Sequence, residues 1–198
     1  EKFSLKRVQK SGARFDEKRL LWLNGAHIRN TPVDKLYEYV SPREDNPQED
    51  GKQTGFWPES AYAPNITKEY RMKVLALAQD RLKMFEDLRG FDYFFAEPEI
   101  DTELIDGNKQ LRKLTDDERR DLLSIARQEF EKITDWTPET IQNCLNELLE
   151  TTGQKPGILF SLVRIVTTWA PFSPQLNDTL ALIGKEKTLQ RIDNYLQK

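Results

Sequence analysis

The chain has 198 residues, 37% of them hydrophobic and 32% charged, with a formal net charge of −3 at pH 7. This composition is typical of a soluble globular protein, and the mildly acidic balance disfavours indiscriminate binding to polyanions such as DNA. A single cysteine excludes an internal disulfide, and a single histidine far from it in sequence disfavours a zinc or iron–sulfur site.

No motif in the chain predicts catalysis or a membrane segment. There is no phosphate-binding loop, no glycine-rich dinucleotide fingerprint and no apolar stretch long enough to cross a bilayer. A catalytic triad would need His27, which has no nucleophile motif near it. We therefore expect no catalytic residue, no metal ligand and no membrane contact.

The amino-terminal part is basic and predicts two helices. Residues 1–40 carry nine Lys and Arg against five Asp and Glu, a balance that suits contact with phosphate groups. Asp16 is a predicted N-cap for a helix running to about Arg29, and Thr31-Pro32 predicts a second helix start. The buried side of that second helix is expected to hold Leu36, Tyr39 and Val40.

The middle of the chain predicts a loop and then a long helix. Residues 41–66 are rich in Pro, Asp, Glu, Gly and Gln, which predicts an exposed loop, with anchoring through its aromatics Phe56, Trp57 and Tyr62 as the alternative. Thr67 begins a predicted amphipathic helix on which Arg81 shares the apolar stripe. The other members of that stripe are Tyr70, Val74, Leu77, Met84 and Leu88. An aromatic cluster at 91–95 and an acidic connection at 97–108 follow.

Helical signals continue to the end of the chain. Thr115 and Glu118 form a capping box, and Thr137-Pro138 marks the start of a further helix that ends near Gly153. No convincing alternating strand pattern is found, so the expected fold class is all-α.

Residues 157–177 contain one charged side chain, Arg164, in otherwise apolar surroundings. Burying an unpaired guanidinium costs about 2–5 kcal/mol, so Arg164 is either satisfied internally, for example by Asp178, or available to a ligand. The helix leads into a loop that Pro171 and Pro174 stiffen. This arrangement suits recognition of a planar, hydrogen-bonding ligand better than it suits catalysis.

Three blocks of sequence together resemble class I glutamyl-tRNA synthetases of the bacterial type. Residues 15–29 resemble the segment after the KMSKS loop, residues 79–83 and the aromatic cluster resemble the next helix, and residues 162–192 resemble the anticodon-binding end. No HIGH-type or KMSKS-type signature is present, so we expect an inactive fragment without cofactors. The resemblance implies a parent enzyme that uses ATP and Mg to join glutamate to tRNA.

The resemblance also implies an α-helical cage with three parts. Residues 1–31 would end a stem-contact domain, and residues 32–107 and 108–198 would form two helical anticodon-binding subdomains. Arg81 is then expected at the third anticodon base, favouring cytosine over guanine. The residues expected at the first two bases are Arg164, Ser173, Pro174 and Leu176. The implied partner is tRNA(Glu), bound by a monomer in the cytoplasm.

By the same resemblance, the basic first helix lies near the inner side of the tRNA. Its candidate stem contacts are Lys18, Arg19, Asn24, His27 and Arg29, although a solvated charged face is the commoner explanation. Trp22 is expected in the core. Trp169 stands where relatives usually have glycine, so a left-handed backbone there would be strained. Trp169 or Phe172 could offer a face for stacking a base.

Two other interpretations remain open at this point. A helical protein-interaction module without RNA binding would show an exposed apolar patch instead of converging arginines. An unspecific RNA-binding domain would bind all anticodon variants equally, with a steep dependence on salt.

Overall fold

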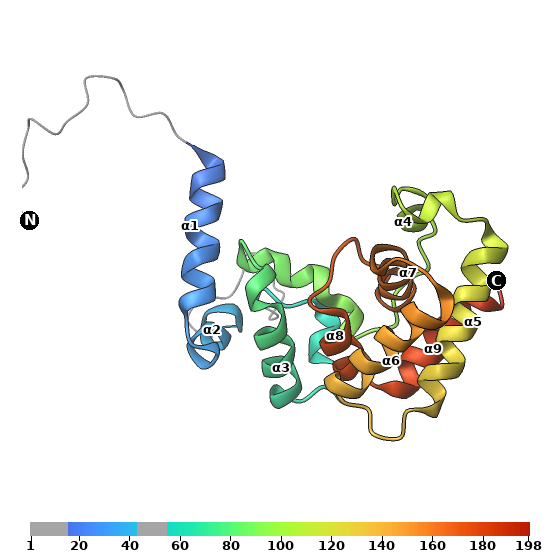
Figure 1. The fold of residues 1–198 in the computed structure, drawn as a ribbon. Helices are drawn as coiled ribbons and strands as arrows, with labels where there is room; N and C mark the ends of the chain where they lie inside the picture. The colour runs from blue at the N-terminus through green and yellow to red at the C-terminus, as the bar shows by residue number, and fades with distance from the viewer. Residues whose placement is uncertain (1–15, 43–54) are drawn as a thin grey trace, which may run out of the picture.

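The computed structural model describes residues 16–42 and 55–198, and all regular elements in these ranges are helical (Figure 1). The α-helices are α1 (Glu17–Asn30), α2 (Val33–Val40), α3 (Lys68–Ala78), α4 (Glu103–Asp106), α5 (Asp116–Lys132), α6 (Pro138–Thr152), α7 (Pro156–Thr168), α8 (Leu176–Ile183) and α9 (Lys185–Leu196). The 3-10 helices are η2 (Glu59–Tyr62), η3 (Gln79–Arg81), η4 (Phe85–Phe94) and η5 (Leu111–Lys113). The all-α prediction is confirmed. None of the helices described is long and apolar enough to cross a membrane.

The predicted helix starts are found where local hydrogen bonds place them. The Asp16 carboxylate accepts from the backbone N–H of Arg19 at 3.1 Å, which caps α1. Thr115 and Glu118 form the predicted capping box at the start of α5, with distances of 2.7 and 3.2 Å. Thr137 caps α6 in the same way through Thr140. These three signals depend on residues within one turn of each other, which is why the sequence alone reveals them.

Two hydrophobic cores hold the helices together. The first joins α1, α2, α3, η4 and the segment around Trp57, with Ala170 and Ile183 added from the far end of the chain. The second joins α5, α6, α7, α8 and α9, and includes Ile105 of α4. Each fully buried large side chain contributes about 1.5–3 kcal/mol, so both cores are substantial. The domain boundary at residues 107 and 108 stays a prediction.

For the second half of the loop at 41–66 the structure shows aromatic anchoring instead of full exposure, and residues 43–54 lie outside those described. Trp57 is 1% exposed and its ring contacts those of Tyr37 and Phe95. Arg71 of α3 holds the same segment, because it donates to the Ala61 carbonyl and the Tyr37 hydroxyl, both at 2.9 Å. Aromatic burial therefore outweighs a composition that is typical of loops.

The predicted helix from Thr67 to Leu88 is also wrong in extent. Helix α3 ends at Ala78, η3 covers Gln79–Arg81, and the backbone of Leu82 is extended. Met84 and Leu88 consequently do not continue the apolar stripe of α3. Arg81 ends the short 3-10 helix η3 instead of lying on a face of α3. In α2 the buried tyrosine is Tyr37, whereas Tyr39 is 46% exposed, contrary to the expectation.

Trp22 does not lie in the core, since its side chain is 65% exposed. Helix α1 packs through Gly25 and Ile28 in its second half, against η3, while its first half projects from the molecule (Figure 1). Leu20 and Leu23 are exposed on the same half. Which residues of α1 are buried is therefore decided by the packing of its carboxy-terminal turns.

Candidate RNA-binding site

Arg164 lies on α7, where its guanidinium is half-buried. Its Nε donates to the Ser173 hydroxyl at 2.9 Å, and that hydroxyl donates to the Pro174 carbonyl at 3.0 Å. No ion pair of Arg164 is found among residues 16–42 and 55–198, so the alternative of a partner such as Asp178 is not what the structure shows. The outer nitrogens of this arginine are thus available to a ligand.

The charge of Arg81 acts on Arg164 although the two are far apart in sequence. Burial lowers the pKa of the Arg164 guanidinium from its ordinary value, and the positive charge of Arg81 lowers it further. Arg81 is exposed at the end of η3, and its side chain makes no hydrogen bond within the part of the chain that the structure describes. Two electrostatically coupled cations, neither of which has an acidic partner among the described residues, favour a ligand that is negative or rich in hydrogen-bond acceptors.

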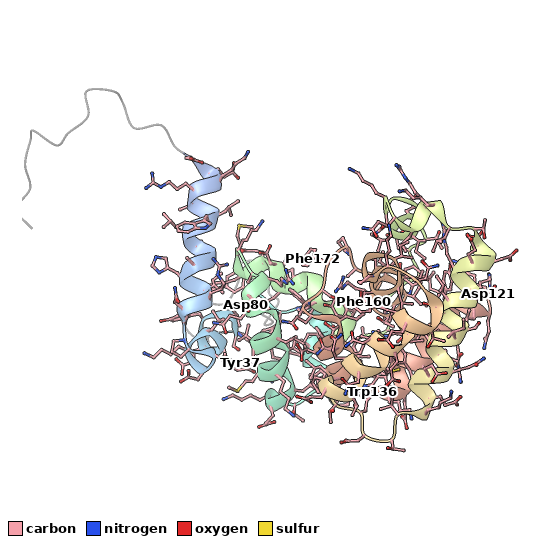
Figure 2. The ribbon with its side chains drawn as sticks, in the orientation of Figure 1. Tyr37, Asp80, Asp121, Trp136, Phe160 and Phe172 are labelled. Atoms are coloured by element: carbon pink, nitrogen blue, oxygen red, sulfur yellow. The ribbon has the colours of Figure 1, made fainter. Side chains whose placement is uncertain are left out.

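An exposed aromatic ring borders this arginine pair. Phe172 directly precedes Ser173 and is 45% exposed. Its ring contacts that of Phe91 edge-on at 5.9 Å, and its tip lies close to Gly90, so the loop after α7 rests on η4. In the view of Figure 2, Phe172 lies between Asp80 and Phe160 of α7. The ring is therefore held in place while part of the residue stays exposed, and stacking on a base needs such a ring.

The loop after α7 begins with a strained residue. Trp169 has φ 44° and ψ 40°, and is the only non-glycine residue with positive φ among those described. A side chain in this region costs about 1–2 kcal/mol relative to glycine. The indole ring lies 6.1 Å from that of Tyr195, away from the arginine pair, so Phe172 is the better candidate for stacking.

Ser173, Pro174 and Leu176 are all buried, and Leu176 packs in the second core. Their side chains are therefore not offered to a ligand, apart from the Ser173 hydroxyl that holds Arg164. What the loop can offer is backbone, because Gln175 precedes α8 without a side-chain cap for its first N–H groups. A contact of Leu176 with RNA stays a prediction, and it would use the main chain.

Lys18, Arg19, Asn24, His27 and Arg29 are all exposed on α1. The side chains of Lys18, Arg19, His27 and Arg29 make no hydrogen bond or ion pair among the described residues. Asn24 differs, because its side-chain amide donates to the Lys83 carbonyl at 2.5 Å. Asn24 is thus engaged within the protein, and its partner Lys83 lies two residues after Arg81.

Sequence reasoning missed Arg191 of α9. This side chain is 2% exposed and donates to the carbonyls of Thr167, Tyr93 and Ala96 at 2.6, 2.9 and 3.2 Å, and to the Glu97 carboxylate at 3.1 Å. A signal was present, since Thr188, Arg191 and Tyr195 share one face of the last helix at spacings of three and four.

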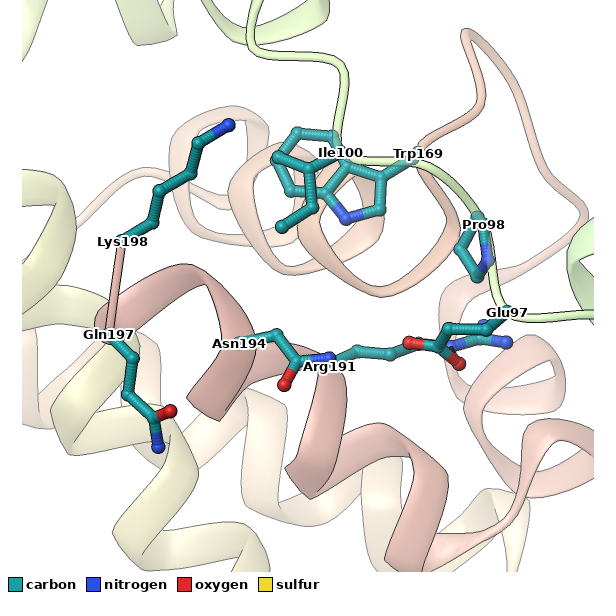
Figure 3. A pocket seen from close by; sticks show the side chains of 8 residues that line it. All are labelled: Glu97, Pro98, Ile100, Trp169, Arg191, Asn194, Gln197 and Lys198. Carbon is teal, nitrogen blue, oxygen red and sulfur yellow. Dashed lines mark hydrogen bonds and ion pairs between the residues drawn. The ribbon is translucent and has the colours of Figure 1, made fainter.

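A pocket of about 380 Å³ lies beside Arg191 and not beside the arginine pair (Figure 3). Its lining residues are Glu97, Pro98, Ile100, Trp169, Arg191, Asn194, Gln197 and Lys198. The Arg191 guanidinium in its wall already donates to protein carbonyls and to the Glu97 carboxylate, so its donors are engaged within the protein.

Comparison with known families identifies the class of this chain. A sequence model of the family described as the anticodon binding domain matches residues 35–196, and the chain therefore belongs to that family. Curated relatives include the glutamate–tRNA ligase of Chlorobium chlorochromatii, 31% identical over the whole chain, and that of Neisseria meningitidis serogroup C, 32% identical over 97% of it. The chain spans 38% and 37% of the length of these two relatives.

A solved structure shows the same fold. The glutamate–tRNA ligase of Elizabethkingia meningosepticum superposes with a TM-score of 0.70 at 20% identity, covering 99% of this chain and 35% of that protein. The similarity extends through both cores and α1. The chain therefore corresponds in fold to about a third of the length of that glutamate–tRNA ligase.

Proposed function

We propose that this chain recognises the anticodon of tRNA(Glu) as part of a glutamate–tRNA ligase. Family membership gives the class of ligand, and one structural observation carries the assignment of the site. Ser173 holds Arg164 directly after the exposed Phe172, the charge of Arg164 interacts with that of Arg81, and neither arginine has an ion pair among the described residues. Splayed anticodon bases present acceptors and π-faces that match these groups.

Each arginine has its own role in this proposal. The guanidinium of Arg81 donates to the third anticodon base and favours cytosine over guanine, with discrimination of about 1–3 kcal/mol for a bidentate contact. Arg164 lies beside the first two bases, where the Ser173 hydroxyl orients its Nε and leaves the outer nitrogens to the RNA. Pro174 and Leu176 contribute main-chain groups, and Phe172 a stacking face. Lys18, Arg19, His27 and Arg29 contact phosphates of the stem.

The chemistry of the whole enzyme belongs to parts that this chain does not span. In the proposal, the parent ligase uses ATP and Mg to activate glutamate and then esterifies it to tRNA. The residues described here act through binding alone, by placing the acceptor end of the RNA in a distant active site. We expect the chain to act as a monomer on tRNA(Glu).

The proposal is tested by fluorescence-anisotropy titration of the chain with an anticodon stem-loop of tRNA(Glu) and with versions altered at each anticodon position. We expect Arg81→Ala to abolish selectivity at the third position only, and Arg164→Ala at the first two only. Arg112→Ala, which removes an exposed arginine of η5, is the matched control and should change neither. Equal binding of all anticodon variants, with a steep dependence on salt, would instead show an unspecific RNA surface and overturn the proposal.

A further inference from the structure

The segment that carries Arg81 is tied to α1 by side-chain amides on both of its sides. Before Arg81, Nε2 of Gln79 donates to the carbonyl oxygens of Ile28 and Thr31, each at 2.7 Å. After Arg81, Nδ2 of Asn24 donates to the carbonyl oxygen of Lys83. Both connections join parts of the chain that are about fifty or more positions apart.

Two further contacts hold the same backbone. A Cβ atom added to Gly25 would lie 3.3 Å from the Leu82 carbonyl oxygen, so α1 packs directly against the peptide groups after Arg81. On the other side, the Asp87 carboxylate accepts from the N–H groups of Lys83 and Met84 at 2.7 and 2.9 Å. The main chain around Arg81 is therefore fixed from several directions.

The side chain of Arg81 contrasts with this fixed backbone, because it is exposed and unbonded within the described residues. A base-reading arginine needs both properties, since its contacts must be placed to within about 0.5 Å while its donors stay available. Fixing the backbone in advance also removes an ordering cost on binding. We propose that Gln79 and Asn24 are positioning residues, which aim Arg81 by locking residues 79–83 to α1. This inference rests on the proposed function of Arg81.

A simpler role would make Gln79 only a cap for the last carbonyls of α1. The two roles differ in what they change. Loss of a cap lowers stability and weakens every RNA complex by the same factor. Loss of positioning lowers the ratio of affinities for cytosine and guanine at the third anticodon position, and it does so only while Arg81 is present.

The variants remove donors while keeping side-chain size. Gln79→Met keeps the length and removes the amide, and Asn24→Asp replaces the donating group by an acceptor. Asn24→Asp alters an exposed bond, so it serves as the second variant if Gln79→Met does not fold. Two controls match them: Gln142→Met breaks a bond to Asn146 on α6, and Asn30→Asp breaks a bond to the Ala26 carbonyl within α1.

The experiment measures affinities of the whole chain for stem-loops with cytosine or guanine at the third position, in wild type and in an Arg81→Ala background. We expect Gln79→Met and Asn24→Asp to lower the affinity ratio at least threefold, against about tenfold for Arg81→Ala. In the Arg81→Ala background neither should lower it further, and selectivity at the first two positions should not change. The two controls should leave every ratio at the wild-type value.

The outcomes separate this inference from the function on which it rests. If Arg81→Ala leaves the third-position ratio unchanged, the role of Arg81 is wrong and the positioning role falls with it. If Arg81→Ala lowers the ratio while Gln79→Met and Asn24→Asp weaken both RNAs equally, only the positioning role is overturned. The positioning role is supported if the two variants lower the ratio when Arg81 is present and do not lower it further in the Arg81→Ala background.

Discussion

The buried guanidinium of Arg191 donates to the carbonyl oxygen of Tyr93 at 2.9 Å and so joins the last helix to the aromatic segment of the first core. The same side chain reaches Thr167 at the end of α7, just before the loop that holds Phe172 and Ser173. One residue thereby links both cores to the start of the candidate site.

We expect Arg191→Met to lower the free energy of unfolding by about 3–5 kcal/mol, because three carbonyls would lose their donor in a buried position. Urea unfolding followed by circular dichroism measures this. Glu97→Gln is the control and should cost less than about 1 kcal/mol, since the Glu97 side chain is about half exposed. Equal losses for the two variants would contradict the importance assigned to the buried carbonyls.

At Trp169 we expect glycine to be a more stabilising replacement than alanine, the reverse of the order at ordinary helical positions. At an ordinary helical position alanine is more stable than glycine, but the φ of 44° at Trp169 penalises any Cβ atom. We expect Trp169→Gly to be more stable than Trp169→Ala by about 1 kcal/mol, as measured by thermal unfolding. Gly153→Ala calibrates the penalty, because Gly153 has φ 65° and an added Cβ would meet nothing within 4 Å. A more stable Trp169→Ala would show that the left-handed backbone is not kept.

Arg164→Lys separates charge from geometry at the candidate site. Lysine keeps the positive charge but cannot both bond Ser173 and present a planar pair of donors. We therefore expect about tenfold lower selectivity at the first two anticodon positions, with an unchanged slope of log affinity against log salt. Stem-loop titrations over a range of salt concentrations measure both quantities. A reduced slope with unchanged selectivity would assign Arg164 to a phosphate.

Cys144 should make the free energy of unfolding fall at alkaline pH. Burial raises the pKa of its thiol to about 11 from the ordinary 9.0, and the charges of Glu129 and Glu147 add to the effect of burial. The unfolded chain releases this proton first, so the contribution is complete below about pH 9 and is lost as the pH rises toward 11. The difference in unfolding free energy between wild type and Cys144→Ala should stay constant at neutral pH and shrink above about pH 9. A constant difference throughout would contradict the shift.

Local signals made part of this structure predictable. Asp16, Thr115 and Thr137 act within one helical turn, and each starts a helix where the sequence indicates. The isolation of Arg164 among apolar residues likewise marks it as a residue that needs a partner, and its bond to Ser173 lies nine positions away. In both cases the relevant interactions depend on neighbours in sequence.

Features that depend on distant residues were not predictable in the same way. No glycine or proline marks the end of α3, which coincides with the bonds of Gln79 to the end of α1. The exposure of Trp22 likewise follows from α1 packing only through its second half. The proximity of Arg81 and Arg164 depends on how η3 and α7 are placed by the two cores, and no spacing rule encodes that.

The direct packing of Gly25 on the backbone after Arg81 has a consequence for the shape of RNA that the protein accepts. The backbone around Arg81 is held against the second half of α1, so the direction of this helix sets where Lys18 and Arg19 lie relative to it. Under the proposed function, an anticodon stem lengthened by one base pair would displace its phosphates from the first helix whenever its third base meets Arg81. The protein would then measure stem length as well as base identity, without any residue dedicated to that task.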